Sequence, residues 1–183
     1  MTRGRQVRVV AVIVVGLAIV VGVVALAVRS SSNEAQSGDV SASAFNLPRL
    51  DEHGRVRLAR FAGRPTVVNF FASWCTACNA ELPDFRQAAG ALQGRVNFLF
   101  VNSNESGDWR PMAERNGILR FPLAKDINGT GGNGLYRSLG GTGGMPITAF
   151  YDSRGKVIDV SYGALTGGLL DQKLQRLYGV PAA

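Results

Sequence analysis

Residue types that build metal sites and disulfide scaffolds are scarce in this sequence. Its 183 residues include two cysteines and one histidine, His53. Two cysteines are too few for a disulfide-rich scaffold, and one histidine excludes a metal site built mainly from imidazoles. A dense basic block is also lacking, although the net charge is +7. The sequence therefore does not have the footprint of a nucleic-acid-binding protein.

The composition is that of a single folded domain. The chain is 46% hydrophobic, 18% charged and 8% aromatic, which is too apolar for a disordered protein. A second domain in a chain of this length would have to be very small.

The N-terminal region contains one long apolar run. Neither a charge nor a proline interrupts residues 9–28. A helix of about 20 apolar residues rises about 30 Å, the thickness of a bilayer core. The run is apolar all round, and a domain of this size could not bury such a helix completely. Three arginines precede the run and only Arg29 follows closely, so the positive-inside rule predicts a cytoplasmic N-terminus and an exported C-terminal part.

We therefore predict four segments along the chain. They are a basic cytoplasmic stub at 1–8, an uncleaved transmembrane anchor at 9–28, a flexible polar linker at 29–44 and a folded domain at 45–183. The alternative is secretion after signal cleavage, because Ala25-Leu26-Ala27 has the pattern of a cleavage site. The apolar run is longer than the usual h-region of about 7–15 residues, which favours the anchor.

Hydrophobic periodicity and turn residues predict alternating elements in the domain. Strands are expected at 45–47, 56–58, 66–72 and 96–101, with an extended piece at 121–123. Helices are expected at 75–92, with a kink at Pro83, at 109–116 and at 166–178. A glycine-rich stretch at 128–144 precedes a hairpin of 147–151 and 157–162. This order predicts an α/β fold with a central mixed sheet and helices on both faces.

The motif Trp74-Cys75-Thr76-Ala77-Cys78 lies where the predicted strand at 66–72 meets the following helix. At a helix N-terminus, Cys75 faces unpaired backbone N–H groups and the positive end of the helix dipole, and both favour the thiolate. The two-residue spacer brings Cys78, one turn later, within disulfide reach. We predict a redox pair in which Cys75 is the exposed attacking sulfur and Cys78 the more buried resolving sulfur.

Three other interpretations of the cysteine pair are open. A structural disulfide would close a loop of four residues and add little stability. A zinc site would need carboxylates or a second chain to complete its four ligands. Two inert core cysteines would not explain the strand–CxxC–helix context. We expect neither a metal nor a cofactor, and the GxGxxG pattern at 129–134 lacks the preceding strand of a dinucleotide site.

Two more residues are candidates for the site. Pro146 follows Met145 at the entrance of the predicted strand at 147–151, where the X-Pro bond is either cis or an ordinary trans bond. Glu81 lies three residues after Cys78, on the same helix face, and could exchange a proton with that thiol. The alternative for Glu81 is a solvated surface carboxylate.

The segment from Asn69 to Cys78, followed by Glu81-Leu82-Pro83, resembles the active site of the TlpA/ResA-like branch of the thioredoxin superfamily. Gly144-Met145-Pro146-Ile147-Thr148 is similar to the cis-proline segment of the same branch. The resemblance covers residues 45–177, including an insertion around 102–123 that ordinary thioredoxins lack. It implies a thioredoxin-like fold and a membrane-tethered, extracytoplasmic thiol–disulfide oxidoreductase.

The resemblance also implies roles for single residues. Cys75 is then the nucleophile, Cys78 the resolving cysteine, Glu81 the active-site glutamate and Pro146 the cis proline that shapes the groove for the partner's cysteine. Trp74 and Met145 are expected to line that groove.

Two departures from the wider superfamily bear on the redox chemistry. Asn69 stands where thioredoxins carry a buried aspartate, which leaves Glu81 as the nearest group to handle a proton. Thr76-Ala77 lacks the frequent proline before the second cysteine, so the redox potential of the family's sites cannot be assigned to this chain.

The expected activity is disulfide exchange with exported proteins. The branch favours a reductase, with apocytochrome c as a candidate substrate and an integral-membrane thiol protein as electron donor. A disulfide-forming oxidase would use the same atoms. A peroxiredoxin-type peroxidase is disfavoured because no Thr or Ser lies three residues before Cys75. A copper carrier would need Cys75, Cys78 and His53 to meet.

Overall fold

The computed structural model describes residues 41–180, except 52, 128, 130 and 132–133. The predicted stub and anchor, and the linker as far as residue 40, lie outside the described residues. Within the described part of the chain, no helix is both long enough and apolar enough to cross a bilayer. All of the described residues belong to one unit, residues 39–183.

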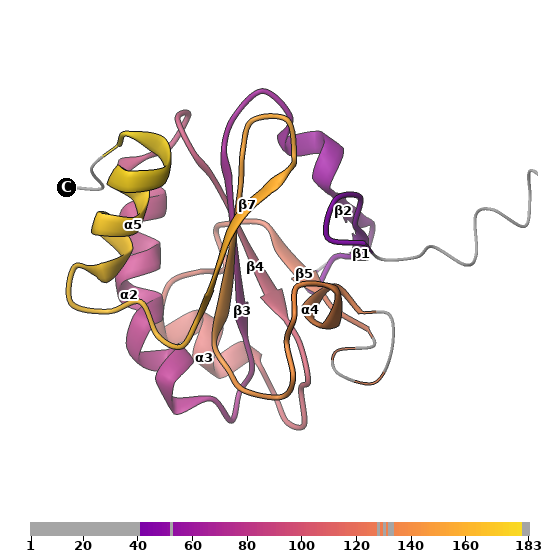
Figure 1. Ribbon diagram of the computed structural model, residues 1–183. Coiled ribbons are helices and arrows are strands. Elements are labelled where there is room, and N and C mark those ends of the chain that lie inside the picture. The colour runs from indigo at the N-terminus through magenta and orange to yellow at the C-terminus, as the bar shows by residue number, and fades with distance from the viewer. Residues whose placement is uncertain (1–40, 52, 128, 130, 132–133, 181–183) are drawn as a thin grey trace, which may run out of the picture. The chain divides into compact units, whose positions relative to one another are not determined.

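A five-stranded sheet with the order β5-β4-β3-β6-β7 forms the centre of this unit (Figure 1). Its strands are β3 (Thr66–Phe71), β4 (Asn97–Asn102), β5 (Leu123–Lys125), β6 (Ile147–Tyr151) and β7 (Val157–Tyr162). Strands β3, β4 and β5 are parallel, while β6 runs antiparallel to both β3 and β7. The predicted mixed sheet is therefore confirmed, and β3, whose six residues are all buried, lies at its centre.

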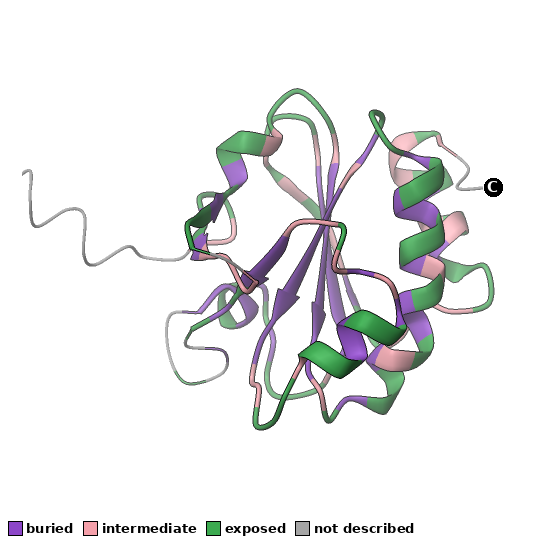
Figure 2. Cartoon of the chain, turned by 180° about the vertical axis from the view of Figure 1, so that it is seen from behind, coloured by how far each residue is buried: buried purple, intermediate pink, exposed green. Residues whose placement is uncertain are grey.

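The two faces of the sheet are covered differently. On one face, helices α2 (Thr76–Ala91), α3 (Arg110–Arg115) and α5 (Leu169–Tyr178) enclose the first core. The other face is covered by helix α4 (Leu135–Ser138), the hairpin of β1 (Asn46–Pro48) and β2 (Arg55–Arg57), and the 3₁₀ helix η1 (Leu58–Phe61). Figure 2 shows the strands buried between these layers and the outer sides of the helices exposed. Helices on both faces are confirmed, although strands share the second face.

Helix α2 forms because its apolar residues recur at helical spacing. Cys78, Leu82 and Phe85 are fully buried in the first core, and Ala89 is nearly so. Pro83 lies inside the helix, which nevertheless remains one element from Thr76 to Ala91. The buried face of α2 fixes the orientation of its first turn, where the cysteines lie.

Several predicted boundaries are displaced. The strand expected at 56–58 ends at Arg57 because Leu58 begins η1, and the extended piece expected at 121–123 is strand β5, two residues later. The last helix begins at Leu169 rather than at 166, because Gly167 and Gly168 have positive φ angles of 60° and 83°.

Helix α4 was not predicted within the glycine-rich stretch. The Asp126 carboxylate accepts hydrogen bonds from the backbone N–H groups of Leu135 (2.8 Å) and Tyr136 (2.9 Å), which begin this helix. Satisfaction of these two donors by a residue outside the helix explains why the local sequence pattern did not reveal it.

Candidate active site

Cys75 and Cys78 form a disulfide at the junction of β3 and α2. Their Cα atoms are 5.2 Å apart, so the two-residue spacer brings the sulfurs into bonding distance as predicted. Cys75 is the N-cap residue of α2, and its Sγ accepts a hydrogen bond from the Cys78 backbone N–H at 3.0 Å. The first sulfur is thus held at the positive end of the helix dipole, where a thiolate is favoured.

Cys75 is much less exposed than predicted. Only 4% of the residue is exposed, compared with 0% for Cys78. Both belong to the first core, where Cys75 packs as an apolar residue in its disulfide form. The predicted order holds, since Cys75 is the more accessible of the two, but a partner sulfur must reach a largely enclosed atom.

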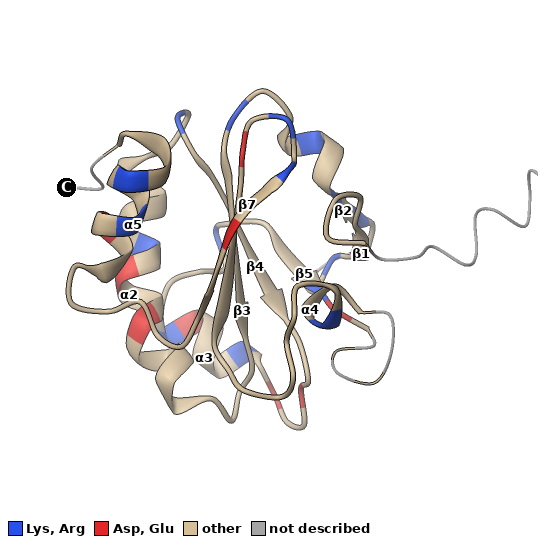
Figure 3. Ribbon diagram, viewed as in Figure 1, with Lys and Arg blue, Asp and Glu red and all other residues tan. Residues whose placement is uncertain are grey.

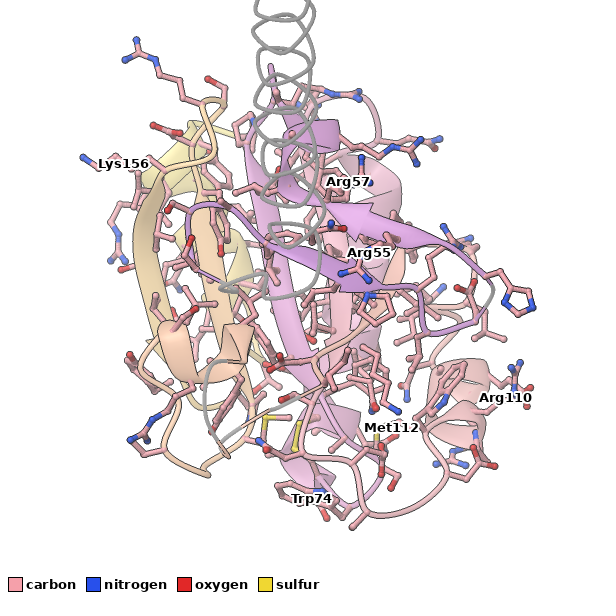
Figure 4. All side chains as sticks on the ribbon, turned by 90° about the vertical axis from the view of Figure 1, so that its right-hand side faces the viewer. Arg55, Arg57, Trp74, Arg110, Met112 and Lys156 are labelled. Carbon is pink, nitrogen blue, oxygen red and sulfur yellow. A yellow bond between two sulfur atoms is a disulfide. The ribbon has the colours of Figure 1, made fainter. Side chains whose placement is uncertain are left out.

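The residues expected to line a partner groove lie at the same edge of the sheet as the disulfide. Trp74 is 47% exposed, and its indole Nε1–H donates to the Asn104 carbonyl at 2.8 Å. The Met145–Pro146 bond is cis, as the resemblance implied. Because Asn69 on β3 pairs with Thr148 on β6, Pro146 stands beside the end of β3 that leads to the cysteines. Figure 4 shows Trp74 at this end of the domain.

Glu81 is completely buried, so its interpretation as a solvated surface residue is wrong. Its Oε1 accepts a hydrogen bond from Asn69 Nδ2 at 2.7 Å, and its Oε2 accepts one from the Leu165 backbone N–H at 2.8 Å. Burial raises the pKa of Glu81 to about 7; the two hydrogen bonds lower it in part, and the charge of Asp84 raises it. A carboxyl group with this pKa can accept or release a proton near neutral pH.

Asn69 connects the glutamate to the sheet. Its Nδ2 also donates to Thr148 Oγ1 at 3.1 Å, and only 1% of the residue is exposed. Its Oδ1 has no hydrogen-bond partner among the described residues. An aspartate here would put a second carboxylate beside Glu81, so the amide leaves one buried acid instead of a coupled pair.

Glu105 is a site residue that the sequence analysis missed. Its carboxylate accepts hydrogen bonds from the Ser73 backbone N–H at 2.9 Å, from Asn102 Nδ2 at 2.7 Å and from the Ser73 hydroxyl. The backbone N–H groups of Ser106 and Gly107 donate to it at 3.0 and 2.9 Å. Partial burial opposes ionisation, but these hydrogen bonds outweigh it, and the pKa of Glu105 is lowered. Glu105 thereby ties the insertion to the residue two positions before Cys75.

The glycine-rich stretch has a role at the site that the sequence left unassigned. The Tyr136 hydroxyl donates to the Gly144 carbonyl at 2.6 Å and accepts from the Gly143 N–H at 3.0 Å. Gly141 passes so close to the Tyr136 ring that a side chain would overlap three ring atoms. The absence of a side chain at Gly141 therefore lets the loop leading to Pro146 pack against this ring.

The copper-carrier hypothesis finds no assembled site. His53 is exposed in the turn between β1 and β2, while Cys75 and Cys78 are bonded to each other at the start of α2. Within the described ranges, no three His, Cys, Asp or Glu side chains are placed to hold a metal ion. The GxGxxG pattern at 129–134 falls partly outside the described residues.

Comparison with known proteins agrees with this geometry. The chain is 36% identical over 81 residues to the thiol:disulfide interchange protein TxlA homolog of Synechocystis sp., covering 43% of this chain and 42% of the relative. It is 30% identical over 141 residues to the thiol-disulfide oxidoreductase ResA of Geobacillus thermodenitrificans, covering 75% and 78%. The crystal structure of a thiol:disulfide interchange protein DsbE from Chlorobium tepidum matches with a TM-score of 0.60 and 27% identity, over 75% of this chain and 93% of that one.

The fold and the cysteine pair define a thiol–disulfide oxidoreductase of the thioredoxin superfamily, of the TlpA, ResA and DsbE type. A family model described as AhpC/TSA matches residues 39–160, and the chain belongs to this family. The chain spans less than half the length of the TxlA homolog and about three quarters of the length of ResA.

Proposed function

We propose that the protein is a membrane-anchored reductase that acts outside the cytoplasm on disulfides of exported proteins. The observation that carries the proposal is the Cys75–Cys78 disulfide at the start of α2, with the buried Glu81 one turn beyond Cys78. Apocytochrome c is the candidate substrate, and an integral-membrane thiol protein is the candidate electron donor. The relatives ResA and DsbE support a thiol–disulfide exchange reaction.

The reaction begins with Cys75. Its thiolate attacks one sulfur of the partner disulfide, and a Cys75–partner disulfide forms while the other partner sulfur leaves as a thiolate. The N–H of Cys78 and the N-terminal end of α2 stabilise the negative charge on the attacking sulfur. Trp74, Met145 and Pro146 line the groove that holds the partner chain.

Cys78 completes the exchange. Its thiol loses a proton, for which Glu81 is the acceptor, and the resulting thiolate attacks Cys75. The Cys75–Cys78 disulfide forms, and the second partner sulfur leaves as a thiolate. Two electrons have then passed from the dithiol to the partner, and the membrane donor restores the dithiol by the same exchange chemistry.

The anchor supports the extracytoplasmic assignment. Residues 9–28 are long and apolar enough to span a bilayer, and the arginines before them favour a cytoplasmic N-terminus. The alternative is a secreted form released by cleavage after Ala25-Leu26-Ala27. Either route exports the cysteine pair.

The redox potential of the full chain tests the direction of the reaction. The protein would be equilibrated with a series of glutathione redox buffers, and the fraction of Cys75–Cys78 disulfide measured by thiol alkylation. A potential near that of thioredoxin, about −270 mV, is expected for a reductase, whereas a value near that of DsbA, about −120 mV, would show an oxidase. Cys75→Ser should abolish insulin reduction, and Cys78→Ser should accumulate the mixed disulfide. Rapid oxidation of Cys75 by peroxide would favour a peroxidase instead.

A further inference from the structure

Six basic residues gather at the end of the domain opposite the disulfide. This basic pole consists of Arg57, Arg60, Arg64, Arg95, Arg154 and Lys156, and all six are exposed. They lie on β2, on η1, in the turns before β3 and β4, and in the β6–β7 turn. Figure 4 shows Arg57 and Lys156 in the part of the molecule remote from Trp74.

Direct contacts hold these segments together. The Gly63 N–H donates to the Ser153 carbonyl at 2.9 Å, which joins the turn before β3 to the β6–β7 turn. Arg64 Nη1 donates to the Gly94 carbonyl at 3.3 Å, which adds the turn before β4. These contacts, with the pocket that Arg57 and Arg154 line together, place the basic segments side by side at one end of the sheet.

The charge along the strands is asymmetric. At the basic pole, the neighbouring acid is Asp152, whose Oδ1 accepts hydrogen bonds from the backbone N–H groups of Arg154 and Lys156. Near the disulfide, Glu105 and the exposed Asp108 follow β4, and they lie beside the exposed Arg110 and Lys125, so the charge at that end is mixed. Figure 3 shows Lys and Arg prevailing in the turns at the upper end and acidic residues in the lower loops.

The N-terminal segment enters the domain at the basic pole. Ser43 and Ala44 line one pocket together with Arg57 and Arg154. The next residue, Phe45, packs edge-on against Tyr151 with ring centroids 6.2 Å apart. The last residues of the predicted linker and the first residue of the domain thus lie beside the basic pole.

We infer that the basic pole docks on the anionic phospholipid headgroups of the membrane that holds the anchor; this inference rests on the anchoring proposed above. The predicted linker before the described residues, 29–40, has 12 residues, and a flexible chain of that length would have an end-to-end distance of about 19 Å and keep the pole close to the headgroups. Each basic residue near an anionic surface strengthens binding by about fivefold. Six such residues beside the tether are enough to orient the domain.

Docking in this orientation directs the disulfide away from the bilayer. Strand β3 runs from the basic pole toward Cys75, and its six residues span about 20 Å. The active site then faces soluble exported proteins, and a donor within the membrane reaches it only when the pole is released.

The test uses the full chain in vesicles, with the Cys75–Cys78 disulfide kept oxidised. A fluorophore on Ser153→Cys reports the basic pole, and one on Ser106→Cys reports the opposite end. Energy transfer to a headgroup-labelled lipid is measured in phosphatidylcholine and in an equal mixture with phosphatidylglycerol. Transfer from position 153 should rise in the anionic vesicles and fall again at high salt, while transfer from position 106 stays low.

A charge-reversed variant distinguishes the effect of the basic pole from the effect of net charge. Arg57→Glu with Arg154→Glu and Lys156→Glu should weaken docking by at least about a hundredfold and abolish the extra transfer. The matched control reverses three exposed basic residues elsewhere, Arg115, Lys125 and Arg137, and should retain docking.

The outcomes distinguish the two proposals. A chain that does not float with neutral vesicles overturns the anchor, and the docking inference with it. If the chain floats but energy transfer from position 153 does not rise with phosphatidylglycerol, the docking inference alone is overturned. Equal loss of transfer in both triple variants also overturns it, because net charge would then explain the effect.

Discussion

The Oε1 atom of Glu81 lies 2.7 Å from Nδ2 of Asn69, and both residues are buried away from solvent. This bond joins the helix that carries Cys78 to the strand that precedes the cysteines. It places a proton-accepting group one helical turn after Cys78 and sets its environment by burial.

Glu81→Gln should remove a pH dependence of stability. The ordinary pKa of 4.5 is raised to about 7 in the folded protein, so the folded state keeps a proton that the unfolded state loses between these values. The wild-type free energy of unfolding should therefore fall as pH rises through that window, by about 3 kcal/mol. Urea unfolding across pH should show a flatter profile for Glu81→Gln. Glu114→Gln, at an exposed position on α3, should keep the wild-type slope.

Asn69→Asp should create a coupled pair of buried carboxyl groups with Glu81. Two negative charges cannot both be accommodated there, so one group stays protonated to a higher pH. Above neutral pH the variant should lose about 1–3 kcal/mol more stability than the wild type. The measurement is urea unfolding on either side of neutrality, with the exposed Asn46→Asp as control. Equal losses in both variants would contradict the pairing.

Glu105→Gln should loosen the segment before Cys75. An amide cannot accept all of the hydrogen bonds that Ser73, Asn102, Ser106 and Gly107 donate, and unsatisfied donors cost about 1–3 kcal/mol. We expect lower stability and a shifted indole N–H resonance of Trp74 in NMR spectra, because Trp74 follows Ser73 directly.

Glu114→Gln is the matched control for Glu105→Gln, and it should change neither quantity. Wild-type stability with an unmoved Trp74 resonance in Glu105→Gln would show that Glu105 does not position the site.

Gly141→Ala should disturb the loop that leads to Pro146. The new methyl group would overlap the ring of Tyr136, and such overpacking costs about 1–3 kcal/mol. The midpoint temperature of thermal unfolding and the rate of insulin reduction should both fall. Gly144→Ala, where a methyl group meets no atom within 4 Å, should be tolerated in the unfolding measurement. Equal stability of the two variants would disprove the steric role of Gly141.

The central elements could be predicted because their signals are local. The buried run before the cysteines and the helical spacing after them lie within 30 residues, and they define the site that the structure contains. The cis bond at Pro146 came from resemblance rather than from local chemistry, since an isolated X-Pro bond favours trans.

What escaped prediction depends on contacts between distant residues. The buried Glu81 accepts a hydrogen bond from the backbone N–H of Leu165, 84 positions later. Glu105 reaches Ser73 across 32 positions, and in the sequence it resembles any polar loop residue. The first N–H groups of helix α4 donate to Asp126, a residue outside the helix. Local helix signals in the sequence do not include such a partner. Such partners become visible only when the chain is folded.

The sulfur of Cys75 closes the first turn of α2 by accepting the Cys78 N–H, so the atom that gains and loses electrons is also the helix cap. A thiolate at this position can accept the same N–H as the disulfide sulfur does. Reduction therefore changes the charge at the cap while the helix keeps its beginning, and turnover requires little rearrangement of the backbone.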